Sequence, residues 1–407
     1  MSAFAASVSH LRVRRGGEHS RVTFIELFFD LVFVFAVTQL SHGLLTHLTP
    51  LGALQTLLLM VAVWWAWIDT AWITNWLDPD KAPVRLLLFA LMLGGLVLSA
   101  AIPKAFEDRA LAVALAYVLM QAARNLFMLW ALRHHDRGNF RNFLRITIWH
   151  VSLAPLWLGG CFVDGADRLL LWALAVGAET IAPMFYFWVP WLGRSTTTDW
   201  TVEGAHMAER CGLFVIIALG ESILITGATV ADLAWTAENV AAFVVAFVGS
   251  VAMWAVYFNI GAERGSRMIA ASDDPGRIAR SGYTYLHILT VAGIIVAAVG
   301  DEMVLHHPSG HPGARELAVL LGGPALYLTG NALFKRLSAP YLPLSHLVGL
   351  GLLVLLIPAA AVTTPLGIAA GVAIVLIVVA SWEWWSLRTG QAPRPAKRKS
   401  RRSNARS

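Results

Sequence analysis

Residues 25–42 read IELFFDLVFVFAVTQLSH. The run is as apolar as a membrane-spanning helix, yet it carries Glu26, Asp30 and Gln39. Because lipid cannot solvate an ionisable side chain, a carboxylate within such a helix needs a partner, water or a function. The stretch therefore predicts a transmembrane helix whose polar residues have to be explained by the rest of the chain.

The composition is that of a membrane protein. Of the 407 residues, 57% are hydrophobic and 14% are charged, and the mean hydropathy is +0.64. A soluble globular protein carries about 25% charged residues, so we expect an all-α integral membrane protein. Cys161 and Cys211 fall in different predicted spans, so neither a disulfide framework nor a zinc cluster is expected. The polar, arginine-bearing N-terminal residues do not resemble a cleavable signal peptide.

Apolar stretches between helix breakers predict about twelve transmembrane helices. Turn-forming sequences such as Leu77-Asp78-Pro79-Asp80 separate them. The predicted spans cover residues 25–47, 51–75, 83–102, 110–132, 142–162, 168–190, 210–230, 238–260, 281–301, 315–334, 343–362 and 366–387.

The basic residues predict the orientation of these spans. Of the 31 Lys and Arg residues, 26 fall in the termini and the loops on one side, 4 fall on the other side, and Arg124 lies within a span. The positive-inside rule then places both termini in the cytoplasm. The net charge of +6 is concentrated in the tail, residues 388–407, which we expect to be disordered and to touch anionic lipid headgroups. Nucleic-acid binding is not expected.

The chain shows weak internal symmetry. FFDLVFVFAVTQLS (28–41) aligns with RCGLFVIIALGESI (210–223), and Gln39 then meets Glu221. Later spans align at slowly growing offsets, which predicts two parallel six-helix repeats related by an axis along the membrane normal. The expected organisation is a cytoplasmic basic arm, a first half, a cytoplasmic linker, a second half and the basic tail. The corresponding residues are 1–24, 25–190, 191–209, 210–387 and 388–407.

Ionisable residues within the predicted spans are the candidates for function. The candidates for an ion or proton pathway, with uncharged or secondary companions, are Asp30, Asp69, Arg124, Glu179, Glu221, His287, Gln39, His150 and Asn331. Each one also has a purely structural explanation. A carboxylate in a first helical turn favours the positive end of the helix dipole, which suffices for Glu26 and Glu209 and is an even alternative for Asp30. His150 and His287 can be core histidines that bond across helices.

Depth separates the strongest candidates from the rest. Glu221 lies about 18 Å along its span from the cytoplasmic side, close to the midplane. No helix end or interface lies near Glu221 or Arg124, so these two either form an ion pair or line a pathway. Asp30 and Asp69 lie nearer the cytoplasm on helices joined by a very short connection, and we expect that they can face one another. Gly220 permits either close packing or a local opening of its helix.

Two long motifs make a family resemblance visible. ELFFDLVFVFAVTQLSH (26–42) and HMAERCGLFVIIALGES (206–222) resemble the bacterial low-temperature-requirement A (LtrA) family over roughly residues 20–388. The resemblance implies a multi-pass protein of the bacterial cytoplasmic membrane and no established reaction. The family's signature positions correspond here to Glu26, Phe29, Asp30, His206, Glu209, Arg210, Gly220, Glu221 and His287.

Three functions compete. The first is a transporter or channel for a small cation or a proton-coupled solute, in which the buried carboxylates bind protons or ions and Arg124 is a counter-charge. The second is a lipid-modifying enzyme, with His206 and Glu209 as neighbours on one helix face. The third is a non-catalytic sensor or scaffold, and an oligomer is compatible with all three. No catalytic, cofactor or metal-binding motif is recognisable, so an enzyme is the less favoured expectation.

Overall fold

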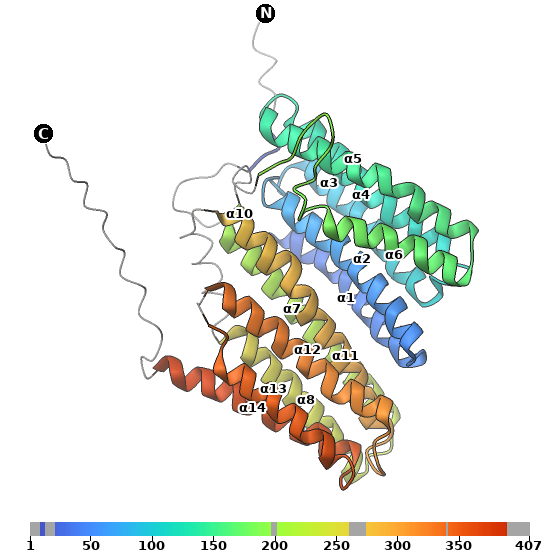
Figure 1. The fold of residues 1–407 in the computed structure, drawn as a ribbon, viewed down its shortest axis with the longest axis vertical. Helices are drawn as coiled ribbons and strands as arrows, with labels where there is room; N and C mark the ends of the chain where they lie inside the picture. Colours follow the sequence, from blue (N-terminus) through green and yellow to red (C-terminus); the bar gives the residue numbers. More distant parts are fainter. Residues whose placement is uncertain (1–8, 13–20, 197–201, 260–273, 339–340, 389–407) are drawn as a thin grey trace, which may run out of the picture.

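The computed structural model describes residues 9–12, 21–196, 202–259, 274–338 and 341–388. In this part of the chain nearly all residues lie in helices, and the long helices run side by side (Figure 1). The predicted arm, linker and tail lie wholly or partly outside the described residues. Arg12, however, is described, because residues 10–12 pair through their backbone with Trp76 and Asp78 at the end of the second helix.

The first group of helices follows the predicted spans closely. Thr49 caps the second helix by accepting from Gly52 N, and Pro50 occupies its first position, where proline is favoured. Asp136 likewise accepts from Asn139 N at the start of the fifth. The helices of this group are α1 (Phe24–Thr46), α2 (Pro50–Thr74), α3 (Ala82–Ala101), η1 (Ile102–Lys104), α4 (Ala110–Leu132), α5 (Arg137–Gly159), η2 (Gly160–Phe162) and α6 (Gly165–Ile181).

The second group contains one irregular helix. A four-residue turn leads into a π-helical segment, which continues without a break into a long α-helix. The helices of this group are α7 (Gly204–Asp232), α8 (Ala237–Phe258), α10 (Pro275–Ile278), η4 (Ala279–Leu286), α11 (His287–His306), α12 (Ala314–Ser338), α13 (Leu344–Ala359) and α14 (Pro365–Arg388).

Every predicted span falls on a helix, but several boundaries differ, and two of the differences concern functional candidates or their surroundings. The predicted span 168–190 is too long, because α6 ends at Ile181 and Pro183 has no N–H with which to continue the helix. The seventh helix begins at Gly204 instead of residue 210, so His206 and Glu209 belong to it. α7 also runs unbroken past Gly220, which excludes a local opening of the helix there.

Nine helical segments in the described residues are long and apolar enough to cross a membrane. These segments contain α1–α4, α7, α8, α11, α12 and α14. The remaining three are less suited: α6 and α13 have 17 and 16 residues, and α5 carries Arg137, Arg141 and Arg145. The protein is therefore a multi-pass membrane protein, all-helical in the part that the structure describes, with nine candidate spans there.

The helices form two groups that meet along one seam. In the first group α1 contacts α2 and α3, and α3, α4, α5 and α6 contact one another in succession. In the second group α7 contacts α8 and α11, and α11, α12, α13 and α14 follow in succession. The groups meet where α1 and α2 pack against α7 and α11 (Figure 1). Residues from both groups, including Phe29, Trp67 and Phe214, share one hydrophobic core at this seam.

Close packing of α11 against α12 gives a test of the fold. A Cβ atom on Gly323 would lie 2.6 Å from Ala297 N, whereas a Cβ on the adjacent Gly322 would meet nothing within 4 Å. Gly323→Ala should therefore lower the stability of the detergent-purified protein by about 1–3 kcal/mol, because the backbones have to separate. Gly322→Ala is the matched control and should leave the melting temperature unchanged or raise it. Equal melting temperatures for the two variants would contradict this packing.

Candidate functional site

Four side chains at the seam form what we call the α1–α7 charge cluster: Glu26, Asp30, His206 and Arg210. Glu26 and Asp30 lie four residues apart on α1, and so do His206 and Arg210 on α7. Each pair therefore shares one helix face. Glu26 Oε1 lies 2.9 Å from His206 Nε2, and Asp30 Oδ1 lies 2.8 Å from Arg210 Nη2. All four side chains are fully buried, so the first turns of both helices are held together by charged contacts in a protein interior.

The Asp30–Arg210 pair sits in an aromatic environment. Trp67 Nε1 donates to Asp30 Oδ1 at 2.7 Å, and the guanidinium lies 5.6 Å from the Trp67 ring centroid and 5.9 Å from that of Phe29. Among the described residues, Asp30 Oδ2 and Arg210 Nε and Nη1 have no hydrogen-bond partner. A helix-end explanation for Asp30 is therefore insufficient, because the carboxylate is the counter-ion of an arginine from the other group.

Glu26 has more partners than a helix-start residue needs. Thr23 N and Thr23 Oγ1 each donate to Glu26 Oε2 at 2.9 Å, as expected for the first turn. Arg12 Nη2 donates to the same oxygen at 3.0 Å, and His206 Nε2 contacts the other one. The dipole interpretation of Glu26 is therefore incomplete. The residue is also the point at which the N-terminal arm, α1 and α7 meet.

The hydrogen bonds of Asn75 fix the tautomer of His206. Asn75 Oδ1 accepts from Glu203 N and Asn75 Nδ2 donates to Glu203 O, which sets the orientation of the amide. Asn75 Nδ2 also lies 3.3 Å from His206 Nδ1, so that nitrogen is an acceptor and Nε2 carries the proton donated to Glu26. Arg12 Nη2 also lies 3.3 Å from His206 Nε2, and with this tautomer it donates to Glu26 Oε2 instead. Glu209 instead accepts from Val22 N. His206 and Glu209 do not converge, so the metal pair considered for an enzyme is not formed.

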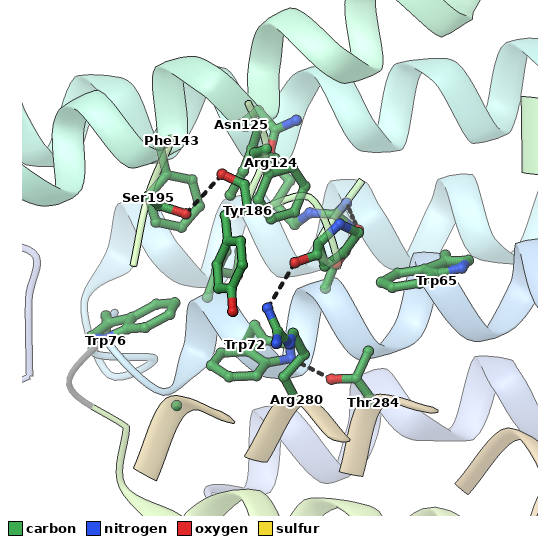
Figure 2. A pocket seen from close by; sticks show the side chains of 16 residues that line it. Trp65, Trp72, Trp76, Arg124, Asn125, Phe143, Tyr186, Ser195, Arg280 and Thr284 are labelled. Atoms are coloured by element: carbon green, nitrogen blue, oxygen red, sulfur yellow. Dashed lines mark hydrogen bonds and ion pairs between the residues drawn. The ribbon is translucent and has the colours of Figure 1, made fainter. Parts of the chain in front are cut away.

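A cavity of about 90 Å³ lies on the other side of α2, between the two groups of helices. Aromatic side chains supply much of its apolar surface, and Figure 2 shows charged and polar side chains reaching into it from both groups. We call it the aromatic cavity. The lining residues used below are Trp65, Asp69, Trp72, Trp76, Arg124, Asn125, Phe143, Tyr186, Arg280 and Thr284.

Asp69 and Arg124 form an ion pair at this cavity. Arg124 Nη2 lies 2.8 Å from Asp69 Oδ2, and the Arg124 side chain is 1% exposed whereas Asp69 is 22% exposed. Asp30 and Asp69 thus have different arginine partners and do not form a carboxylate pair. Glu221 and Arg124, for which an ion pair was one of two expectations, do not pair with each other either. The short α1–α2 connection brings the helices together, but the rotation of each helix about its axis decides which side chains meet.

A hydrogen-bonded chain leads from the surroundings of this ion pair to Glu179. It begins at Gln121, whose amide lies close enough to act on the Asp69 carboxylate, and Gln121 Nε2 donates to Tyr117 Oη at 3.0 Å. Tyr117 Oη in turn donates to Glu179 Oε2 at 2.5 Å. Glu179 is buried on α6, so two carboxylates on different helices are connected through α4.

The second group contributes Arg280 and Thr284 from η4. Arg280 Nη1 donates to Pro183 O at 2.7 Å, and its guanidinium lies 5.0 Å from the centroid of the Tyr186 ring. Trp72 Nε1 donates to Thr284 Oγ1 at 2.9 Å. Tyr186 has a φ of 56°, and a left-handed conformation at such a residue costs about 1–3 kcal/mol. The contacts of the loop after α6 thus hold a strained aromatic side chain against the cavity.

Of the remaining predicted residues, His150 lies behind the cavity residue Asn125, and the others lie outside both sites. Glu221 is buried and hydrogen-bonds to Thr38 Oγ1 across the seam, and Gln39 lines a small cavity near the far ends of α1 and α2. His150 lies 2.6 Å from Asn125 Nδ2, and His287 Nε2 lies 2.8 Å from Tyr257 Oη. These cross-helix bonds agree with the structural explanation of both histidines. Asn331 Nδ2 donates to Tyr327 O on its own helix.

Sequence reasoning missed several participants. Tyr117 was not singled out, and Arg280 was counted only as a loop charge. A tyrosine and a glutamine four residues apart on an apolar helix were the available signal for the chain to Glu179. Lys335 was also counted as a loop charge. Its Nζ lies 2.7 Å from Glu383 Oε2, so Glu383 is a buried, paired carboxylate.

The comparisons with known proteins agree with the motifs on α1 and α7. Residues 21–381 match the family described as "Bacterial low temperature requirement A protein (LtrA)". A protein of Rhizobium meliloti (strain 1021), named "Uncharacterized protein RA0937", is 38% identical over 387 residues, which cover 95% of this chain and 94% of that protein. The comparison with solved structures gave no match. The motifs that supply the α1–α7 charge cluster thus lie within the matched region, and the chain belongs to the bacterial LtrA family.

Proposed function

We propose that this LtrA-family protein is a proton-coupled transporter of a small solute in the bacterial cytoplasmic membrane. The solute binds in the aromatic cavity, Asp69 accepts and releases the coupled proton, and Arg124 is its counter-charge. Glu179 is the second proton site, connected to Asp69 through Gln121 and Tyr117. The protein is not an enzyme in this proposal.

One observation carries the proposal: a partly exposed carboxylate lies in a cavity formed by both groups of helices. The second group reaches the cavity through Arg280 and Thr284, and the first group supplies Asp69 and the aromatic walls. Transporters bind their substrates between their repeats, where a relative movement of the two parts changes access to the site. An ionisable residue at such a place is expected to be functional.

The wider architecture of the proposal is twelve spans in two parallel six-helix repeats, with both termini in the cytoplasm. The order of contacts supports the repeat, because each pair of neighbours in the series α1–α6 has a counterpart in the series α7, α8 and α11–α14, and α14 returns to α8 as α6 returns to α2. The proposed orientation is supported by the basic residues, of which 26 lie on the predicted side of the termini and 4 on the opposite side. In this arrangement the basic tail contacts anionic lipid headgroups.

Proton movement in proteoliposomes tests the proposal. The vesicles contain a pH-sensitive dye and the low-molecular-mass fraction of a bacterial cytosol, so that the solute is supplied without being identified. In a solute gradient, a pH gradient or both, the wild-type protein should change the internal pH faster than protein-free vesicles do. Asp69→Asn should abolish that change, because the amide cannot bind the proton.

Asp80→Asn is the matched control. Asp80 is 73% exposed and lies in the loop after α2, so the variant should behave as the wild type. If the wild-type protein moves no protons under any of these gradients, or if Asp69→Asn moves them at the wild-type rate, the proposal is wrong.

A further inference from the structure

We propose that the aromatic cavity takes a short-chain monocarboxylate, held by Arg124 and Arg280, together with one proton on Asp69. This inference rests on the proposed function and names the class of solute. It follows from the size of the cavity, the chemistry of its walls and the balance of charges within it.

The size of the cavity and the chemistry of its walls favour a small, largely apolar ligand. The volume is about 90 Å³, whereas an engineered apolar cavity of about 150 Å³ accommodates benzene. A ligand of about four or five non-hydrogen atoms therefore fits by the same measure. Trp65, Trp72, Trp76 and Phe143 surround it with apolar surface, so a solute covered with hydroxyl or amino groups would lose its hydration without replacement.

The charge balance selects an anion. Two guanidinium groups and one carboxylate line the cavity, and that carboxylate already belongs to Arg124. Among the described residues, Arg280 has no carboxylate partner; it bonds to Pro183 O and stacks on Tyr186. Aromatic walls alone would suit an organic cation, but Arg280 already lies over the Tyr186 ring and would repel one. A planar carboxylate instead matches the fork of guanidinium N–H donors.

A proton on Asp69 releases Arg124 for the ligand. In the unliganded protein Arg124 Nη2 donates to Asp69 Oδ2. When Asp69 binds a proton its charge disappears, and the ligand carboxylate takes its place on Arg124. One anion and one proton then enter together, so the loaded site carries the same net charge as the empty site.

The other ionisable groups around Asp69 are compatible with this exchange. Arg280 adds a second positive charge, and Glu179 at the far end of the hydrogen-bonded chain adds a negative one. The titratable and charged groups that act on Asp69, or on Arg124, from the surrounding elements are Tyr117 and Arg124 of α4, His150 of α5, Glu179 of α6, Tyr186 of the following loop, and Arg280 and Tyr285 of η4.

Binding of radiolabelled propionate to the purified full-length protein, measured by scintillation proximity, tests the inference. Binding should be saturable and tighter at mildly acidic than at mildly alkaline pH, because protonated Asp69 leaves Arg124 to the ligand. Unlabelled propionate should displace it, whereas neutral propionamide and tetramethylammonium should not. Arg280→Gln should weaken binding roughly tenfold or more, because it removes a charged donor.

Arg277→Gln is the matched control, since Arg277 lies one turn earlier, is 61% exposed and pairs with Asp274 outside the cavity. If Arg280→Gln does not fold, Arg280→Lys keeps the charge but loses the fork and the stacking, and should bind propionate with intermediate affinity. Displacement by tetramethylammonium would overturn the inference. So would an absence of propionate binding in a protein that still moves protons with the cytosolic fraction, and in that case the transport proposal stands.

Discussion

Arg210→Met should destabilise the protein by about 3–5 kcal/mol, the cost expected when one partner of a buried ion pair is removed. The substitution leaves Asp30 fully buried, with Trp67 Nε1 as its remaining hydrogen-bond donor among the described residues. Methionine fills a similar volume between the Phe29 and Trp67 rings, so the loss comes mainly from charge. Thermal unfolding of the detergent-purified protein, followed by intrinsic fluorescence, measures the effect.

The double variant separates charge from packing. Asp30→Asn together with Arg210→Met removes both charges, and the asparagine oxygen still accepts from Trp67 Nε1. Its loss of stability should be clearly smaller than the sum of the two single losses, because no charge is left buried without a partner. Arg85→Met is the control: that arginine pairs with Asp80 at 3.3 Å in an exposed position, and the change should cost at most about 1 kcal/mol. Additive losses at Asp30 and Arg210 would show that the ion pair contributes nothing.

Sequence reasoning was reliable for the helices because their signal is local. Apolar run length and breakers placed the fourth span at 110–132, which is where α4 lies. Errors occurred where the ends depend on tertiary contacts. α7 begins six residues before its predicted start, because the polar residues His206 and Arg210 lie in the protein interior and not in a loop. A hydropathy argument treats such residues as the end of a span.

The partners of the polar residues could not be predicted in the same way. Asp30 and Arg210 are 180 residues apart, and nothing local indicates that they meet. Asp69 was expected to be able to face Asp30, although its partner is Arg124, which was recognised only as a general counter-charge. Pairing depends on the rotation of each helix, and a change of one position in a helix turns a side chain by about 100°. The sequence therefore identified which residues need partners, but not which partners they have.

The π-helical segment decides which side chains of the second group face the cavity. Side-chain periodicity of 3.6 residues does not hold across η4, where one turn contains an additional residue. His287 Nδ1 lies 2.9 Å from Gly282 O, five residues earlier, in the segment that carries Arg280 and Thr284. An ordinary helical projection would assign these two residues to the wrong face. π-Helical turns are frequent at functional sites, which agrees with the proposed role of this segment.

Glu26→Gln should also destabilise the protein by about 3–5 kcal/mol, although glutamine has nearly the same shape. Four donors surround the carboxylate: Thr23 N, Thr23 Oγ1, Arg12 Nη2 and His206 Nε2. A carboxylate accepts from all four donors. In glutamine an NH₂ group replaces one of the two oxygens, so its N–H groups would face other hydrogen-bond donors. His206 cannot turn into an acceptor by a change of tautomer, because Asn75 holds its Nδ1 as the acceptor.

A first-turn acid elsewhere in the chain distinguishes this network from a simple helix-dipole effect. Asp167 is in the first turn of α6 and is exposed, so Asp167→Asn removes only the favourable interaction with the dipole, worth about 0.3–1 kcal/mol. If Glu26 were only a helix-start residue, both variants would show the same small fall in melting temperature. A much larger fall for Glu26→Gln, reduced in a background that already carries Arg12→Gln, would instead identify Glu26 as the residue that joins the N-terminal arm to α1 and α7. The two contacts of the α1–α7 charge cluster then act together. The Asp30–Arg210 pair stays shielded from water only while the Glu26–His206 contact holds the starts of α1 and α7 together.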